Sequence, residues 1–122
     1  MALALDIMKG GFSAGSAKAI GGQANTAVSA AGTTITDATD LTLSINIVTT
    51  AAASSGVQLP NADIGDSVDI LNLGANAVTV YPPSATAQIN ALTAGAGFLL
   101  ATNTAVTLKK FSALRWMGFL SA

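Results

Sequence analysis

Three aspartates at a spacing of three residues are the first candidates for chemistry in this chain. Asp63, Asp66 and Asp69 lie within NADIGDSVD, and clustered carboxylate oxygens are ligands that calcium prefers. The spacing differs from that of an EF-hand loop, Glu is absent from the chain, and Asp69 falls within an expected strand. The residues therefore favour the alternative, in which the Asp side chains cap a turn. A glycosidase built on Asp63 and Asp66 is a weaker alternative, since the chain is small and has no Glu.

A second candidate is the stretch GGFSAGSAK, residues 10–18, which has the glycine spacing of a phosphate-binding loop. Such a loop needs Lys directly after its second Gly. Here Ser16 follows Gly15, and Lys18 comes too late. We therefore do not expect nucleotide binding.

The composition limits the remaining chemistry. The chain has no Cys and no His, and all of its acidic residues are Asp, so thiol chemistry, imidazole catalysis and the usual zinc ligand sets are excluded. Charged residues make up 9% of the chain and the net charge is −1, which suits neither a nucleic-acid binder nor an acidic tail. We expect no enzyme activity, cofactor, metal or small-molecule substrate.

The basic and aromatic residues near the C-terminal end offer binding rather than catalysis. Lys109 and Lys110, with Arg115 beyond them, form the one basic cluster, which suits a solubilising strand edge or an acidic patch on a partner. Trp116 could stack on a sugar, but a single Trp in an apolar strand is more often a core residue.

Nothing in the sequence predicts a membrane segment. The hydrophobic fraction is 51%, but no uninterrupted apolar run reaches the roughly 18 residues that a spanning helix needs. The opening MALALDIMKGG lacks the basic start and apolar core of a secretory signal, so we expect the chain to begin inside a cell.

The composition and the pattern of apolar residues change near residue 40. This change divides the chain into a predicted arm and a predicted β domain. Residues 1–39 are rich in Gly, Ala, Ser and Thr, and their few large apolar side chains cannot offset the cost of ordering the backbone. We expect this arm to become ordered by lying on its own β domain, a sister subunit or a larger assembly. Its alanines favour a short helix within residues 13–30, whereas its glycines oppose one.

From Leu41 onward, apolar and polar residues alternate with a period of two. In LTLSINIVTT, Leu41, Leu43, Ile45 and Ile47 form the apolar set of a half-buried strand. Short runs follow at VQLP, SVDILNL, AVTVY, QINAL, FLLAT, AVTLKKF and LRWMGFL. We expect residues 40–122 to fold as an all-β domain, an antiparallel β-sandwich or small barrel, with SVDILNL and AVTVY paired as a hairpin.

Two details refine this prediction. Pro82 and Pro83 cannot donate to a β ladder, so the Tyr-Pro-Pro sequence is expected to end a strand and direct the chain into its next segment. In the last run both alternate sets are apolar, with Trp116 on one face and Met117 and Phe119 on the other. A strand of this kind is buried on both faces, as in a subunit contact.

The stretches NIVTTAAASSGVQLP, GDSVDILNLGANAVTVYPPSATAQINAL and AGFLLATNTAVTLKKFSALRWMGFL resemble a module of virion structural proteins of tailed bacteriophages. The resemblance covers residues 45–120 and is most specific at residues 74–92. The later Thr-Ala-x-Arg-Trp pattern of such modules is matched only as SALRW, Ser112 to Trp116.

This resemblance implies a non-enzymatic capsid decoration, head-fibre or tail-appendage protein. We expect it to attach to the shell through its N-terminal arm, residues 1–39, and through multiple copies. The expected partners are the major capsid protein or other virion proteins and further copies of the chain, as a homotrimer. The expected location is the virion, assembled in the host bacterial cytoplasm. The alternative is a tail-appendage module that binds the host surface or carbohydrate. The residues expected to contact partners are Leu5, Ile7, Met8, Phe12, Ile20, Lys109, Lys110, Trp116 and Phe119.

Overall fold

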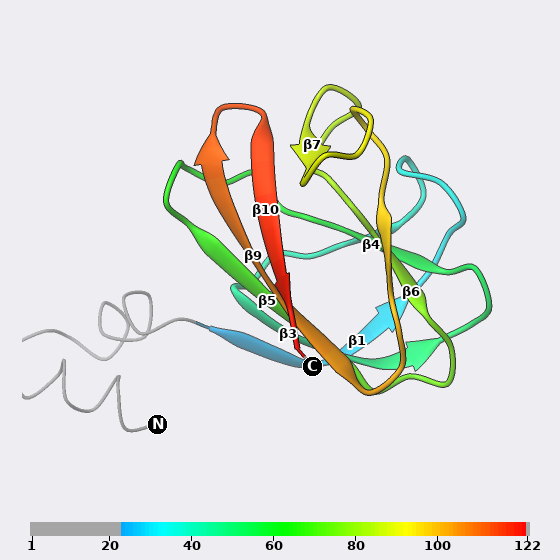
Figure 1. Ribbon diagram of the computed structural model, residues 1–122. Helices are drawn as coiled ribbons and strands as arrows, with labels where there is room; N and C mark the ends of the chain where they lie inside the picture. The colour runs from blue at the N-terminus through cyan, green and yellow to red at the C-terminus, as the bar shows by residue number, and fades with distance from the viewer. Residues whose placement is uncertain (1–22, 122) are drawn as a thin grey trace, which may run out of the picture.

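The computed structural model describes residues 23–121, and this part of the chain is built from ten strands in two sheets (Figure 1). In chain order the strands are β1 (Ala24–Ala30), β2 (Thr39–Asp40), β3 (Ile45–Ala51), β4 (Gly56–Gln58), β5 (Ser67–Asn72), β6 (Val78–Tyr81), β7 (Gln88–Ile89), β8 (Phe98–Leu100), β9 (Thr104–Ser112) and β10 (Arg115–Leu120). One sheet has the order β1-β3-β5-β9-β10-β7 and the other the order β2-β4-β6-β8. No helix occurs in these residues, and therefore none that could span a membrane.

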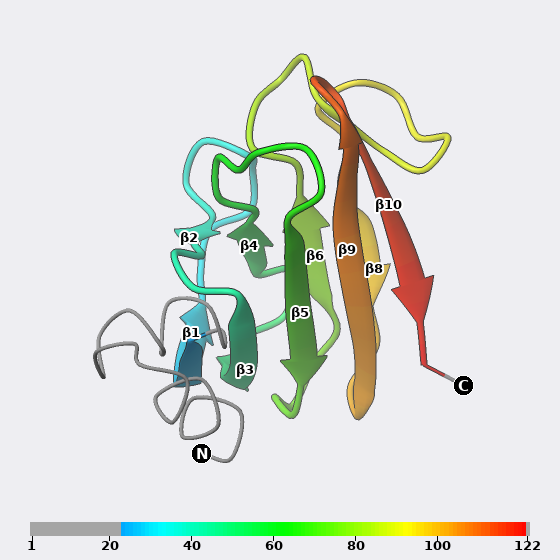
Figure 2. The same cartoon turned by 90° about the vertical axis from the view of Figure 1, so that its left-hand side faces the viewer.

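The first six strands alternate between the two sheets. β1, β3 and β5 lie in the six-stranded sheet, whereas β2, β4 and β6 lie in the four-stranded one. Each strand pairs in parallel with the next strand of its own sheet, so β3 joins both β1 and β5, and β4 joins both β2 and β6. The chain therefore winds as a β-solenoid, in which each coil adds one strand to each sheet (Figure 2).

The last strands end this winding with antiparallel pairs. β8 pairs antiparallel with β6, β9 pairs antiparallel with β5, and β10 turns back along β9. The short β7 is added in parallel to β10. Both sheets therefore contain parallel and antiparallel pairs. The parallel coils lie toward one end of the molecule, and the antiparallel pairs lie toward the other.

The core lies between the two sheets and consists mainly of small and medium apolar side chains. Buried residues alternate with more exposed ones along β5 and β6, as the pleat of a strand requires. Val48, Val57, Val78 and Val80 are fully buried, and Trp116 is the largest buried side chain. Valine suits these positions because its branched side chain packs well on a pleated surface.

The predicted all-β class is confirmed, but the predicted antiparallel sandwich or barrel is wrong. The stretches SVDILNL and AVTVY do not form a hairpin, because β5 and β6 belong to different sheets. The connection between them carries the chain across the core instead of reversing it. From residue 45 onward, the alternation in the sequence shows where the longer strands lie, but it does not show which strands pair with each other.

The predicted inward face of LTLSINIVTT is confirmed at Leu41, which belongs to the core, but it is wrong within β3. Asn46 and Val48 point into the core, while Ile45 and Ile47 point outward. The Asn46 Nδ2 donates to the Leu43 carbonyl oxygen at 2.9 Å and to the Asp69 carbonyl oxygen at 3.4 Å, whereas its Oδ1 is buried without a partner among the described residues. A polar residue with such partners occupies an inward position, and the isoleucines are left on the outside.

The predicted boundary between arm and domain also differs from the structure. Residues 24–39 belong to the fold, because β1 is a full strand and its Val28 and Ala30 are buried in the core. The helix considered within residues 13–30 is replaced by this strand over Ala24–Ala30. The start of the fold thus lies well before residue 40.

The Tyr-Pro-Pro segment acts as the predicted strand end. Pro82 is buried, and the Gln58 side-chain amide donates to the carbonyl oxygens of Pro82 and Pro83 at 3.3 and 3.0 Å. The Leu59 N–H donates to the Tyr81 carbonyl oxygen at 2.9 Å. Two successive coils are therefore linked where the chain leaves β6.

Asn72 links the two sheets through its side chain. It is fully buried at the end of β5, and its Nδ2 donates to the carbonyl oxygens of Asn76 at 2.9 Å and Leu100 at 3.0 Å. Its Oδ1 accepts the Gly74 N–H at 2.9 Å. This one amide satisfies buried polar groups of the 73–77 turn and of β8.

We predict that Asn72→Ala lowers the free energy of unfolding by about 2 to 4 kcal/mol, because two buried hydrogen bonds and a third, partly buried one are lost. Urea unfolding followed by circular dichroism measures this change. Asn61→Ala, at an exposed position, is the matched control and should change the stability by less than about 0.5 kcal/mol. Equal midpoints for the two variants would contradict the structural role of Asn72.

Asp37 caps the turn that follows β1. Its Oδ1 accepts the N–H groups of Thr33 at 3.0 Å and Thr34 at 2.7 Å and the Thr34 hydroxyl at 2.9 Å. The bonds from Thr34, followed by the one from Thr33, hold the pKa of the Asp37 carboxyl below its ordinary value of 3.8. Ionised Asp37 therefore contributes stability above the ordinary pKa, and this contribution is lost as the pH falls through the lowered pKa.

We predict that Asp37→Asn is less stable than the wild type at pH 7 and that the difference disappears near pH 2. Thermal unfolding of both proteins across this pH range measures it. A difference that stayed constant with pH would show that the charge of Asp37 does not contribute.

Candidate functional site

The three aspartates are not grouped as a metal site, and the side chains of Asp66 and Asp69 make separate hydrogen bonds. Asp66 Oδ2 accepts the Asp63 N–H at 2.9 Å, and the Asp66 N–H donates to the Asp63 carbonyl oxygen at 3.0 Å, so the turn-capping interpretation is confirmed for Asp66. Asp69 lies on β5 and accepts the Thr107 hydroxyl at 2.6 Å. Within residues 23–121, no group of three or more side chains is placed to hold a metal ion.

The expected basic cluster is spread over three positions with different roles. Lys110 Nζ donates to the Ala62 carbonyl oxygen at 2.6 Å and so holds a loop against the sheet. Arg115 donates to Gln88 Oε1 at 2.9 Å, across the pairing of β10 with β7. Lys109 is exposed and points outward from β9. Only Lys109 of these three is thus placed mainly for contact with a partner.

Trp116 is a core residue, which corrects its assignment as a partner contact. Its side chain is fully buried between the sheets and packs in the main apolar cluster. It cannot stack on a sugar from this position. Phe119, three residues later on the outward side of β10, is 58% exposed and remains available.

The other expected partner contacts lie outside the described residues. Leu5, Ile7, Met8, Phe12 and Ile20 all precede Gln23, where the described chain begins. Their contacts with partners therefore stay predictions.

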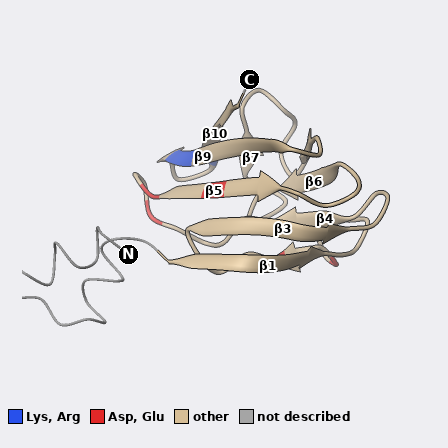
Figure 3. Ribbon diagram, turned by 90° about the horizontal axis from the view of Figure 1, so that it is seen from below, with Lys and Arg blue, Asp and Glu red and all other residues tan. Residues whose placement is uncertain are grey.

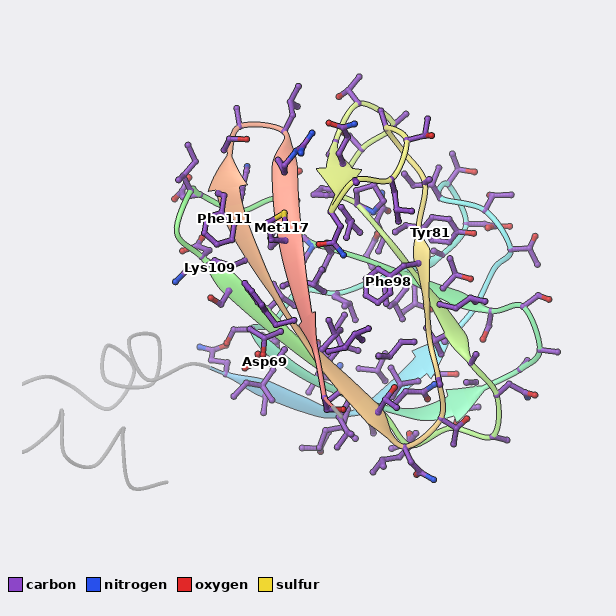
Figure 4. The ribbon with its side chains drawn as sticks, in the orientation of Figure 1. Asp69, Tyr81, Phe98, Lys109, Phe111 and Met117 are labelled. Atoms are coloured by element: carbon purple, nitrogen blue, oxygen red, sulfur yellow. The ribbon has the colours of Figure 1, made fainter. Side chains whose placement is uncertain are left out.

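The surface best suited to binding is the outward side of the six-stranded sheet, which we name the outer face. The register aligns Ile45, Asp69, Thr107 and Phe119 in one row across β3, β5, β9 and β10. A second row consists of Ser67, Lys109 and Met117, and a third of Ile47, Leu71 and Ala105. Phe111 extends the outer face at the end of β9. Figure 4 shows Asp69, Lys109, Phe111 and Met117 on the same side of the molecule.

The outer face combines large apolar side chains with a few charges. Phe111 is 52% exposed, and Ile45 is 37% exposed. Asp69 and Lys109 supply opposite charges on neighbouring strands, and Figure 3 shows how few charged residues the surrounding strands carry. A mixed surface of this kind is typical of a protein interface.

Sequence reasoning found only part of this surface. The alternation of residues on β10 placed Met117 and Phe119 together on the face opposite Trp116. Ile45, however, was expected in the core, because it alternates in the sequence with polar residues, as Leu41 and Leu43 do. Phe111 follows the two lysines and gave no separate signal. The sequence does not show that the Ile45 side chain points outward. This direction follows from the burial of the neighbouring Asn46.

A second apolar surface lies where the two sheets separate at β8 and β10. It is a groove of about 420 Å³ lined by Asn90, Ala91, Leu92, Phe98, Leu99, Val106, Gly118 and Leu120. Leu99 and Leu120 are 69% and 63% exposed at its rim. Asn90 Oδ1 accepts the Gly118 N–H at 2.8 Å and covers part of the strand edge. The groove has no ionisable group, so it can bind apolar surface but supplies no acid or base.

No protein-family model, curated protein or solved structure matches this chain.

We predict that Trp116 and Phe119, although three residues apart on one strand, differ sharply in their effect on stability. Trp116→Ala should lower the free energy of unfolding by about 3 to 5 kcal/mol, because it leaves a large cavity in the core. Phe119→Ala should change it by less than about 0.5 kcal/mol, because the ring is largely exposed. Denaturant unfolding of the isolated chain tests both values. A stable Trp116→Ala variant would show that Trp116 does not support the core.

Proposed function

We propose that this chain is a non-enzymatic structural protein of a tailed-bacteriophage virion, a capsid decoration or head-fibre protein, that contacts the shell through its outer face. The observation that carries the proposal is the exposed row of Ile45, Asp69, Thr107 and Phe119, which has large apolar side chains at both of its ends. The resemblance of residues 45–120 to virion modules supplies the type of particle. The partner is then the major capsid protein or another virion protein.

The chemistry of the outer face fits attachment to a repeated surface. Each large side chain that becomes buried contributes about 1.5 to 3 kcal/mol, so a few residues give a weak single contact. Many copies, or an oligomer with several faces, convert weak contacts into stable attachment. The lateral strand pairs hold the side chains in fixed positions, which lowers the entropy lost on binding. A homotrimer, the state implied by the resemblance, is part of this proposal.

The assembled virion is the proposed location, with assembly in the host bacterial cytoplasm. A carbohydrate-binding role on a tail appendage receives less support, because the single Trp is buried in the core. The exposed aromatic residues of the outer face are phenylalanines, which lack the hydrogen-bonding group that Tyr and Trp offer to a sugar.

We predict that Phe119→Asp reduces the number of copies per purified particle by at least about tenfold, because a charge enters the apolar contact. Quantitative immunoblotting of particles assembled with each variant measures the copy number. The matched control is Leu99→Asp, which places the same charge on an exposed leucine of β8, in the other sheet. It should keep the normal copy number.

Both variants alter exposed residues, so circular dichroism should show an unchanged fold. Normal occupancy for Phe119→Asp would contradict the assignment of the outer face. Loss of occupancy for Leu99→Asp alone would place the contact at the groove between β8 and β10. Absence of the wild-type chain from particles would contradict the virion role itself.

A further inference from the structure

The first coil of the solenoid leaves two strand edges open at the same end of the molecule. β1 is the outermost strand of one sheet and β2 is the outermost strand of the other (Figure 2). β1 is paired on one side with β3, and five of its seven residues are exposed. An open edge of this length presents backbone N–H and C=O groups that can pair with a further strand.

The spacing between coils shows which segment would fit this edge. Ala24 pairs with Ile45, Asn25 with Asn46, and Ala30 with Ala51, each 21 positions along the chain. Val28 pairs with Val48, 20 positions along, at an irregularity in the ladder, and the pairs on either side of it keep the spacing of 21. The same step backward from β1 leads to residues 3–9, LALDIMK. The connection would also have the right length, since residues 10–23 are as many as residues 31–44 between β1 and β3.

Three residues that stand 21 positions before buried residues of the first coil are also apolar. Ile7 corresponds to Val28 and Ile20 to Leu41, and both Val28 and Leu41 belong to the core cluster. Ala17 corresponds to Ala38, which is also buried.

A glycine gives the most specific match. Gly32 has a φ of +78°, and a Cβ at this position would collide with the backbone of Asp37. Only glycine fits such a turn without strain. Gly11 stands 21 positions before Gly32, so the segment carries glycine where the turn requires it.

We propose that the open edge of β1 is the docking site for residues 3–9 of the same chain, which pair with it in parallel and make residues 3–23 a further coil. Lys9 departs from the pattern, because it corresponds to buried Ala30. It stands at the end of the added strand, where a long side chain can direct its ammonium group to solvent.

The inference goes beyond the proposed function and does not depend on it. It gives Leu5 and Ile7 a role within the chain, whereas the sequence suggested that they contact a partner. Its test needs no particles, so its failure and a failure of the virion role are distinguishable.

A cysteine cross-link tests the docking and its register, because the chain contains no natural Cys. Ser29 is exposed on the outward side of β1, and Met8 would lie beside it. Neighbouring strands are about 4.8 Å apart, within the Cα separation of about 4.4 to 6.8 Å that a disulfide spans. The full-length double variant Met8→Cys with Ser29→Cys should form an intramolecular disulfide under mild oxidation. Non-reducing electrophoresis and mass spectrometry measure the yield.

The control is Lys9→Cys with Ser29→Cys, which closes a loop of nearly equal length but places one thiol on the opposite side of the strand. We expect at least fivefold less intramolecular disulfide in this control. Equal yields in both variants, or no disulfide in either, would overturn the proposal. Cross-linked dimers without the intramolecular product would show that a second copy occupies the edge and would also overturn it.

Amide hydrogen exchange of β1 gives a second readout in the full-length chain. Ile7→Asp puts a charge at the position that corresponds to buried Val28, so exchange over residues 24–30 should become at least about tenfold faster. Met8→Asp puts the same charge at an outward position and should leave the exchange rates near those of the wild type. Identical rates in both variants and the wild type would contradict docking through Ile7.

Discussion

Parallel pairing between successive coils is the constraint on which the rest of this structure depends. A strand such as β3 has its backbone groups paired on both sides, with β1 and with β5, while one face of the same strand is buried. Each coil must therefore return to the same sheet in a register that aligns its inward residues with those of the preceding coil. Small apolar residues and buried amides such as Asn72 meet this requirement, because they fill the narrow core and satisfy the turns.

The same constraint produces the outer face. Once Asn46 and Val48 point inward on β3, the period of the strand forces Ile45 and Ile47 outward. The register then aligns Ile45 with Asp69, Thr107 and Phe119 on the neighbouring strands. Exposed apolar residues that look scattered in the sequence become one continuous surface. Residue positions on this surface are set by backbone pairing, so binding requires little rearrangement.

The sequence predicted the all-β class and the strand at AVTVY, which is β6 in the structure. It also predicted the turn role of Asp66 and the strand end at Pro82, because these depend on neighbouring residues alone. It did not predict the parallel winding, since the strands that pair are separated by whole coils and several are only two or three residues long. Nor did it predict the outward side of Ile45, which follows from the burial of the neighbouring Asn46.

A cryo-electron microscopy reconstruction of particles that carry this protein tests the central claim most directly, because it shows which surface of each copy meets the shell. The account predicts that the outer face, with Ile45 and Phe119, lies against the shell, while the side chains of β8 face away from it. A reconstruction in which the outer face is exposed to solvent and another surface makes the contact would contradict the account.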